Sequence, residues 1–298
     1  MNIKYLYKNH RAMKALTGMG INEFKELIPV FKQALNEYYE QKHDRKRAPG
    51  GGKKGHLKTI EDKLFFILFY LKTYPTFDVL AFFSRKGRGR SCEAVHVYLS
   101  LIEKALGQKI SLPKRKIRSV DEFLEHYPEV IDVFVDGTER RIQRPKKSKS
   151  AKRHYSGKKR CHTRKNVIVT DEKKRILVVS PTKPGRRHDK NCVDRIHFAN
   201  NLPEYVSIWG DSGFQGLQHS HAATYIAKKG RKNKPLTKEE KESNTIISSL
   251  RIGVEHAIGG MKKYRVMGDV LRNKCGIFKD KIALVTAALW NYHQVYAF

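Results

Sequence analysis

Three carboxylates far apart in the 298-residue sequence stand where they could share one metal site. Asp136 and Asp211 each follow an apolar, β-branched run that predicts a buried strand. If these strands are neighbours in a parallel sheet, both side chains open into the crevice where α/β sheets bind ligands. Glu255 lies in a predicted helix beside an apolar face suited to pack on that sheet.

Clustered carboxylates repel one another unless a cation binds them, and oxygen ligands favour Mg²⁺ or Mn²⁺. Two such ions about 3.5–4 Å apart would activate a water or a 3′-hydroxyl for in-line displacement at phosphorus. Each acid also has an ordinary structural explanation, because Asp-Gly and Asp-Ser-Gly are common turn sequences and Glu255 alone would be a helical surface acid. The prediction of a two-metal site therefore depends on all three acids together.

Two cations accompany Glu255 on the predicted helix. Arg251 precedes it by one turn and Lys262 follows it by two turns, so all three are expected on one helical face. Such cations suit a pair of DNA phosphates. The alternative is a simple Arg–Glu ion pair worth about 0.3–0.5 kcal/mol. A kink at Gly259-Gly260 could also carry Lys262 off this face.

The charge balance points to a polyanionic partner. The chain has 61 Lys and Arg against 29 Asp and Glu, a net charge of +32, while 40% of its residues are hydrophobic. This composition excludes wholesale disorder and makes nucleic acid the leading partner, with an anionic membrane surface as the weaker alternative. The apolar runs are shorter than the roughly 20 residues that span a bilayer, and the four cysteines form no C-x-x-C pair.

Residues 119–298 are predicted to form an α/β domain. Apolar runs predict a mixed five-stranded sheet with flanking helices, in an order that fits an RNase H-like fold. The expected strands cover 130–135, 162–170, 175–180, 205–209 and 224–227. The expected helices lie near 189–200, after the capping box Thr237–Glu240, and at 278–296.

The N-terminal part is predicted to be helical. Residues 1–56 hold an amphipathic helix at 21–40, kinked or divided at Pro29, and then a glycine-rich basic linker with Lys53 and Lys54. The linker could follow a phosphate backbone or serve as a solvated tether, and these alternatives remain open. The basic residues Lys158 and Lys159, farther along the chain, are further candidates for DNA contact.

Residues 57–118 are predicted to hold three helices and a connector. The helices cover 60–72, 76–83 and 91–107, the first with a Thr59–Asp62 capping box and the third capped by Ser91. A basic loop at 84–90 approaches the third helix, and it carries Arg85, Lys86, Arg88 and Arg90. This pattern is typical of a helix-turn-helix that reads a major groove, and the alternative is a helical bundle without DNA contact.

Motifs along nearly the whole chain resemble those of one family. The acids lie in VDGTERRIQRP, WGDSGFQG and RIGVEHAIGGMKKYRV, with YSGKKRCHTRKN and PGRRHDKN between the first two. Together with the segment from APGGGKKGH to YPTFDVLA, these resemble the DDE transposases of bacterial insertion sequences, in the insertion-sequence-five group related to the PIF/Harbinger type. The resemblance implies an RNase H-like fold and a divalent-metal triad of Asp136, Asp211 and Glu255. In PGRRHDKN, Asp189 is expected to cap a helix rather than act as a fourth metal ligand.

The resemblance also implies an activity. We expect a Mg²⁺- or Mn²⁺-dependent DNA transposase, with two ions, that binds the terminal inverted repeats of its element, cleaves the DNA and joins the 3′-hydroxyl ends to target DNA. The expected partners are double-stranded DNA and at least one further copy of the chain, in the cytoplasm on nucleoid DNA. The alternatives are a non-catalytic DNA-binding protein derived from a transposase, and an RNase H-like nuclease without strand transfer.

Overall fold

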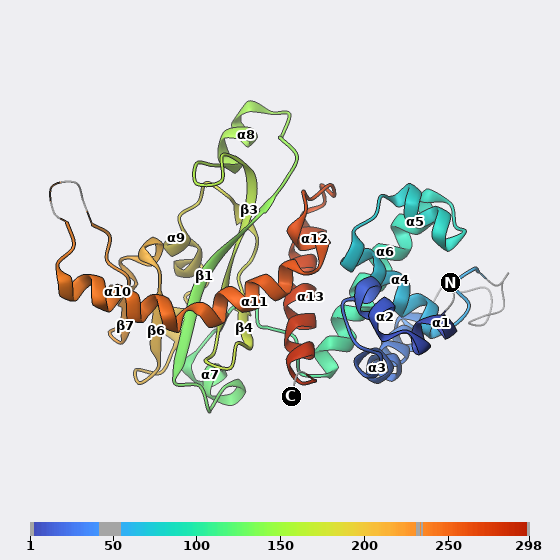
Figure 1. Cartoon of the computed structure of the whole chain (residues 1–298), viewed down its shortest axis with the longest axis horizontal. Helices are drawn as coiled ribbons and strands as arrows, with labels where there is room; N and C mark the ends of the chain where they lie inside the picture. The colour runs from blue at the N-terminus through green and yellow to red at the C-terminus, as the bar shows by residue number, and fades with distance from the viewer. Residues whose placement is uncertain (1–2, 42–54, 231–232, 234, 297–298) are drawn as a thin grey trace. The chain divides into compact units, whose positions relative to one another are not determined.

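A computed structural model of the chain describes residues 3–41, 55–230, 233 and 235–296 (Figure 1). The chain divides into two compact units. The helical unit comprises residues 1–112, 261–269 and 273–298, and the sheet unit comprises residues 113–260 and 270–272. The last long helix therefore belongs with the N-terminal helices rather than with the sheet. The functional boundaries predicted at 56/57 and 118/119 stay a prediction.

The helical unit is built on long amphipathic helices with aromatic residues in its core. Phe24, Phe31, Phe66 and Phe278 are almost fully buried. Its described helices are α1 (Ile3–Lys8), α2 (His10–Thr17), α3 (Ile21–Glu40), α4 (Ile60–Thr73), α5 (Phe77–Ser84), α6 (Arg88–Gln108), α12 (Arg265–Gly268) and α13 (Gly276–Gln294). The sequence did not indicate α1 and α2, and α3 runs as one helix through Pro29 rather than dividing there.

Capping residues explain where several of these helices begin. Thr59 and Asp62 form both hydrogen bonds of the predicted capping box at α4, and Thr76 caps α5. The prediction for α6 was wrong, because the helix begins at Arg88 after Gly87, and Ser91 is buried inside the first turn. The loop between α5 and α6 is therefore only residues 85–87.

The sheet unit contains a mixed sheet that is seven-stranded within the described residues. The order is β2-β3-β1-β6-β7, with β4 and β5 also pairing with β3. β3 is antiparallel to β1, whereas β6 and β7 run parallel to β1. The strands are β1 (Asp132–Arg141), β2 (Tyr155–Ser156), β3 (Cys161–Thr170), β4 (Ile176–Val179), β5 (Lys183–Pro184), β6 (Ser207–Gly210) and β7 (Thr224–Ile226). The predicted strands are all present, and β2 and β5 are short additions.

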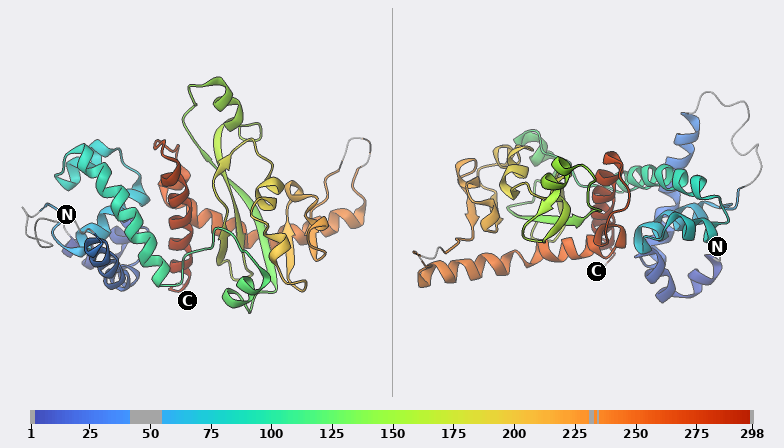
Figure 2. Two further views of the ribbon diagram at one scale, coloured as in Figure 1. Left: turned by 180° about the vertical axis from the view of Figure 1, so that it is seen from behind. Right: turned by 90° about the horizontal axis from the view of Figure 1, so that it is seen from above.

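Helices lie on both faces of the sheet (Figure 1, Figure 2). One face buries Val133, Val135 and Ile208 against apolar residues of α7 (Val120–His126) and α9 (Asp189–Asp194). α10 (Lys238–Leu250) and α11 (Ile252–Lys262) cross the other face. A short helix, α8 (Ser148–His154), precedes β2.

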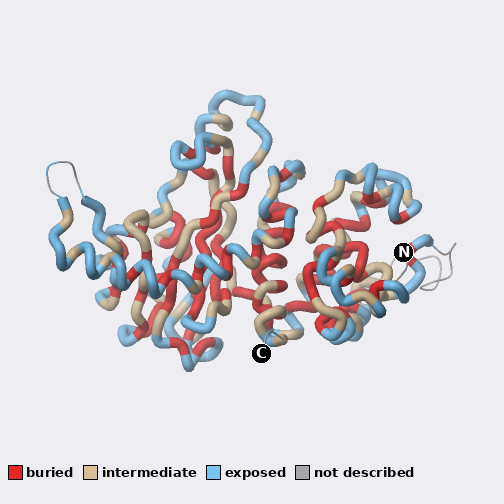
Figure 3. The backbone as a smooth tube through the Cα atoms, in the orientation of Figure 1, coloured by how far each residue is buried: buried red, intermediate tan, exposed pale blue. Residues whose placement is uncertain are grey.

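The central strands, which lie between the helices of the two faces, are the most buried part of the sheet unit (Figure 3). β4 is buried at every position and β3 along its C-terminal half. The mixed α/β architecture predicted from the sequence is therefore confirmed. None of the described helices is long and apolar enough to cross a membrane.

Candidate active site

Asp136 and Asp211 occupy equivalent places on two neighbouring strands. β1 and β6 are parallel, and their last paired residues are Val135 and Gly210. Asp136 and Asp211 each come next along the chain, so they follow paired positions of the two neighbouring strands. Asp136 does not end its strand as predicted, because β1 continues to Arg141 through its pairing with β3.

Backbone amides orient both carboxylates. Oδ1 of Asp136 accepts a hydrogen bond of 2.8 Å from the amide of Gly137. Oδ1 of Asp211 accepts one of 2.9 Å from the amide of Gly213 and so caps the short 3₁₀ turn Ser212–Phe214. Each Asp thus also makes the turn-type bond that the sequence suggested as its structural explanation. The second oxygen of each carboxylate is not used in these bonds.

The environment of Asp136 works against its negative charge. Burial raises the pKa of Asp136 to about 6, although the Arg251 guanidinium and the Gly137 amide both favour the ionised form. The charges of Asp211 and Asp189 contribute to this rise. A nearby divalent cation would relieve this repulsion, and hard carboxylate oxygens are the ligands that Mg²⁺ and Mn²⁺ prefer. The two aspartates therefore fit a divalent metal.

Arg251 contacts this site directly. Its Nη2 lies 3.3 Å from Oδ1 of Asp136, and the residue is only 8% exposed. The predicted single helix is divided here, since α10 ends at Leu250 and α11 begins at Ile252. In this arrangement Arg251 pairs with a carboxylate, which is neither the phosphate contact nor the Arg–Glu pair considered from the sequence.

Glu255 is exposed on α11 and is not gathered with the two aspartates. Within the described residues, no three His, Cys, Asp or Glu side chains come together in a group that could hold a metal ion. α11 continues through Gly259-Gly260 to Lys262, which is exposed and belongs to the helical unit. The roles of Glu255 and Lys262 therefore stay predictions.

Asp189 has a different place from the one predicted. His188 occupies the N-cap position of α9, and the cap makes no side-chain hydrogen bond, so the prediction that Asp189 is the cap was wrong. Instead, Oδ1 of Asp189 lies 2.9 Å from Nζ of Lys165, which also lies 3.3 Å from Oε1 of Glu139. Lys165 and Glu139 were not predicted from the sequence, because they meet only through the pairing of β1 with β3.

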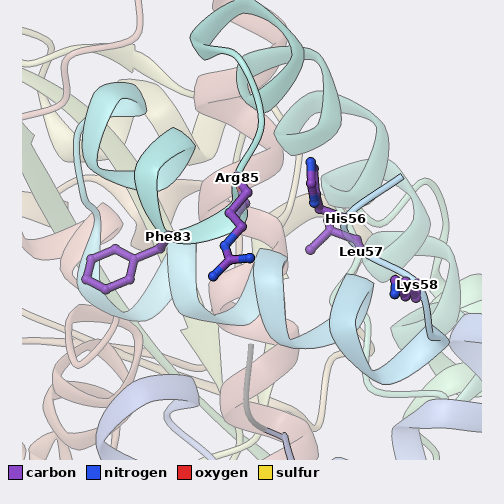
Figure 4. A pocket seen from close by; sticks show the side chains of 6 residues that line it. His56, Leu57, Lys58, Phe83 and Arg85 are labelled. Atoms are coloured by element: carbon purple, nitrogen blue, oxygen red, sulfur yellow. The ribbon is translucent and has the colours of Figure 1, made fainter. Parts of the chain in front are cut away.

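The basic residues proposed for DNA contact in the helical unit surround the α5–α6 turn. Arg85, Arg88 and Arg90 are exposed, and Lys86 is half-buried. A pocket of about 390 Å³ opens beside this turn, lined by His56, Leu57, Lys58, Phe83, Ser84 and Arg85 (Figure 4). Burial lowers the pKa of Lys86, and the neighbouring charges of Lys63 and Arg90 lower it further. Such crowding of cations favours an anionic partner.

The remaining basic candidates divide between two places. Lys158 and Lys159 are exposed in the turn between β2 and β3 of the sheet unit. Lys53, Lys54 and the rest of the linker at 42–54 lie outside the described residues.

Comparison with known proteins identifies the family. Residues 135–291, more than half of the chain, match the family model of the DDE superfamily endonucleases, and the chain belongs to this family. A protein of Microchaete diplosiphon, named a probable transposase for insertion sequence element IS702, is 29% identical over 273 residues, which cover 91% of this chain and 94% of that protein. No solved structure matches the chain. The resemblance to the DDE transposases of insertion sequences is confirmed.

Proposed function

We propose that the chain is a DNA transposase that binds the terminal inverted repeats of its element, hydrolyses phosphodiester bonds and joins the freed 3′-hydroxyls to target DNA. The observation that carries this proposal is the placement of Asp136 and Asp211 directly after the last paired residues of adjacent parallel strands. In a member of the DDE endonuclease family, this is where the first two acids of the catalytic triad are expected. The RNase H-like fold belongs to the same proposal.

Asp136 and Asp211 would hold the divalent ions, most simply two Mg²⁺ or Mn²⁺. A bound metal pair supplies an activated nucleophile and stabilises the leaving oxygen. Asp136 would hold this metal while it keeps its contact with Arg251, because the guanidinium favours the ionised carboxylate that binds metal. The guanidinium, held near the site by its place between α10 and α11, would also reach a DNA phosphate.

Glu255 is the proposed third acid, and it would orient the hydrolytic water. Its support is its place one helical turn after Arg251, whose guanidinium reaches Asp136. We propose that it joins the aspartates when metal and DNA are bound. Lys262, at the end of the same helix, would hold a phosphate near the scissile bond.

The helical part is proposed to bind the element's ends. α5, the turn at residues 85–87 and α6 have the short connection typical of a helix-turn-helix. The exposed cations Arg85, Arg88 and Arg90 lie in this turn and the first turn of α6, where phosphate contacts would orient α6 on a duplex. Pairing of two element ends requires at least two copies of the chain in the working complex.

The test uses the full chain, Mg²⁺ and a labelled element end. The parent should nick this DNA, and Asp136→Asn should lose nicking while it still binds the end. Asp132→Asn is the matched control, because Asp132 lies on the same strand, where its carboxylate accepts a hydrogen bond from the Trp209 indole that an Asn oxygen can also accept. If Asp136→Asn cuts as well as the parent, the catalytic assignment fails. A parent that cuts but never joins ends to target is a nuclease, and one that only binds is a non-catalytic DNA-binding protein.

A further inference from the structure

The carboxylate of Asp189 lies against two glycines that follow the active-site aspartates. A Cβ atom at Gly137 would lie 2.6 Å from Oδ1 of Asp189, so the Asp189 carboxylate or the strand would have to shift to admit it. At Gly213 a Cβ would lie 3.1 Å from Oδ2 of the same carboxylate. Asp189 therefore lies against the backbone of β1 at Gly137 and against the turn at Gly213, at positions that carry no side chain.

These are the same glycines whose amides orient the aspartates. Gly137 donates to Oδ1 of Asp136, and Gly213 donates to Oδ1 of Asp211. A shift of either glycine would move the carboxylate bound to its amide. Asp189 thus contacts the backbone that determines the positions of Asp136 and Asp211.

Asp189 is paired with a buried cation. Its Oδ1 lies 2.9 Å from Nζ of Lys165, a residue only 7% exposed. The same Nζ donates to the carbonyl of Arg187 at 3.0 Å and lies 3.3 Å from Glu139. Thr163 donates to the other oxygen of Glu139 at 2.7 Å. Oδ1 of Asp189 is thus paired with a buried ammonium that several other groups hold in place.

Asp189 approaches from the far face of β1. Successive residues of a strand point to opposite faces, so the space beside Gly137 lies on the face opposite to the Asp136 side chain. Asp189 occupies that space from α9, whereas Arg251 reaches Asp136 from the face that α10 and α11 cross. These contacts place Asp189 on the face of β1 opposite to the Asp136 carboxylate.

We propose that Asp189, clamped by Lys165, is a positioning residue that sets the spacing of the Asp136 and Asp211 carboxylates through Gly137 and Gly213, and so sets their affinity for divalent metal. This inference rests on the proposed function, because it assumes that the two aspartates bind metal. Groups that orient metal ligands from behind typically change metal affinity or activity by about 10–100-fold when they are removed. Asp189→Asn, which keeps the shape but weakens the clamp, should fall in this range.

The experiment measures Mn²⁺ binding to the full chain by electron paramagnetic resonance without DNA, and the Mg²⁺ dependence of nicking on a labelled element end. Asp189→Asn should raise the Mn²⁺ dissociation constant about 10–100-fold and regain nicking at high metal concentration. Asp194→Asn is the matched control, since it lies on the same helix and loses a comparable ion pair, with Lys190 at 2.7 Å. This control should bind and cut like the parent.

A second pair of variants tests the contact itself. Gly137→Ala should weaken Mn²⁺ binding because the three atoms nearest to the new methyl group all belong to the Asp189 side chain. In an Asp189→Ala background these three atoms are absent, so the double variant should bind Mn²⁺ no more weakly than the weaker single variant. Losses that multiply would show that Asp189 does not act through Gly137.

Three results would overturn the inference. If Asp189→Asn binds Mn²⁺ and cuts like the parent, Asp189 positions nothing, while the proposed function stands because the parent still cuts. If Asp189→Asn loses Mn²⁺ at every concentration, as Asp136→Asn should, Asp189 is a metal ligand. If the parent neither binds Mn²⁺ nor nicks, the proposed function fails and this inference fails with it.

Discussion

Replacement of Arg251 by methionine should shift metal binding by the active-site carboxylates to higher pH. The guanidinium lies 3.3 Å from Asp136 and favours its ionised form, while burial raises the pKa of Asp136 to about 6. Metal binds the ionised carboxylate, so affinity falls as the pH drops below this pKa. Methionine keeps much of the side-chain volume but removes the charge that opposes protonation.

The size of the shift follows from the contact distance. An opposite charge within about 4–6 Å lowers a carboxyl pKa by roughly 1–3 units, so its loss should raise the pKa of Asp136 by that amount. A two-unit rise would leave Asp136 about one-quarter ionised at pH 7.5, compared with nearly full ionisation in the parent. Metal affinity of the variant should therefore be about fourfold lower at pH 7.5 and recover near pH 9.

The assay is Mn²⁺ affinity between pH 5 and pH 9, measured by electron paramagnetic resonance without DNA. Arg251→Lys is the control, because it keeps a positive charge. Its Mn²⁺ affinity should fall at nearly the same low pH as that of the parent. If Arg251→Met weakens Mn²⁺ binding equally at every pH, or leaves it unchanged, Arg251 does not control the ionisation of Asp136. If Arg251→Met weakens only the binding of DNA, Arg251 contacts a DNA phosphate and does not affect metal binding.

Three further predictions concern stability, DNA binding and the third acid. The folded-state pKa of Asp136 is raised from 3.8 to about 6, so its stabilising contribution is present below pH 3.8 and is lost as the pH rises through 6. The Tm of the metal-free parent, relative to that of Asp136→Asn, should therefore fall between pH 4 and pH 7.5, by the equivalent of about 3 kcal/mol at most. Equal pH profiles for the two proteins would contradict this prediction. Arg85→Ala should reduce the steepness with which the logarithm of the binding constant for the element end falls against the logarithm of the salt concentration, by about 0.9 per lost phosphate contact. Lys32→Ala, on the exposed surface of α3, should leave this slope unchanged. Equal slopes for both variants would remove Arg85 from the DNA interface. Glu255→Gln should reduce nicking by at least about 100-fold. Its Mn²⁺ affinity without DNA should change little, since Glu255 is not gathered with the two aspartates. Full nicking by this variant would exclude Glu255 as the third acid.

Local features of the sequence determined most of the elements. The Thr59–Asp62 pair begins α4 because a capping box needs only four successive residues to satisfy the first amides of a helix. The apolar run before Asp136 became β1 for an equally local reason, its β-branched composition. Short-range patterns were less informative at α6, where Gly87 rather than Ser91 precedes the helix.

The contacts within the site could not be read from the sequence, because they join residues brought together only by strand pairing and helix packing. The apolar runs before Asp136 and Asp211, and then the motif resemblance, selected these two residues, but their alignment arises from the parallel register of β1 and β6. The ion pair of Arg251 with Asp136 depends on how α10 and α11 cross the sheet. Composition alone determined that the chain is strongly cationic and able to form a core. Tertiary structure decided which charges meet, because ion pairs form over a few ångströms in space, whatever the separation of their residues along the chain.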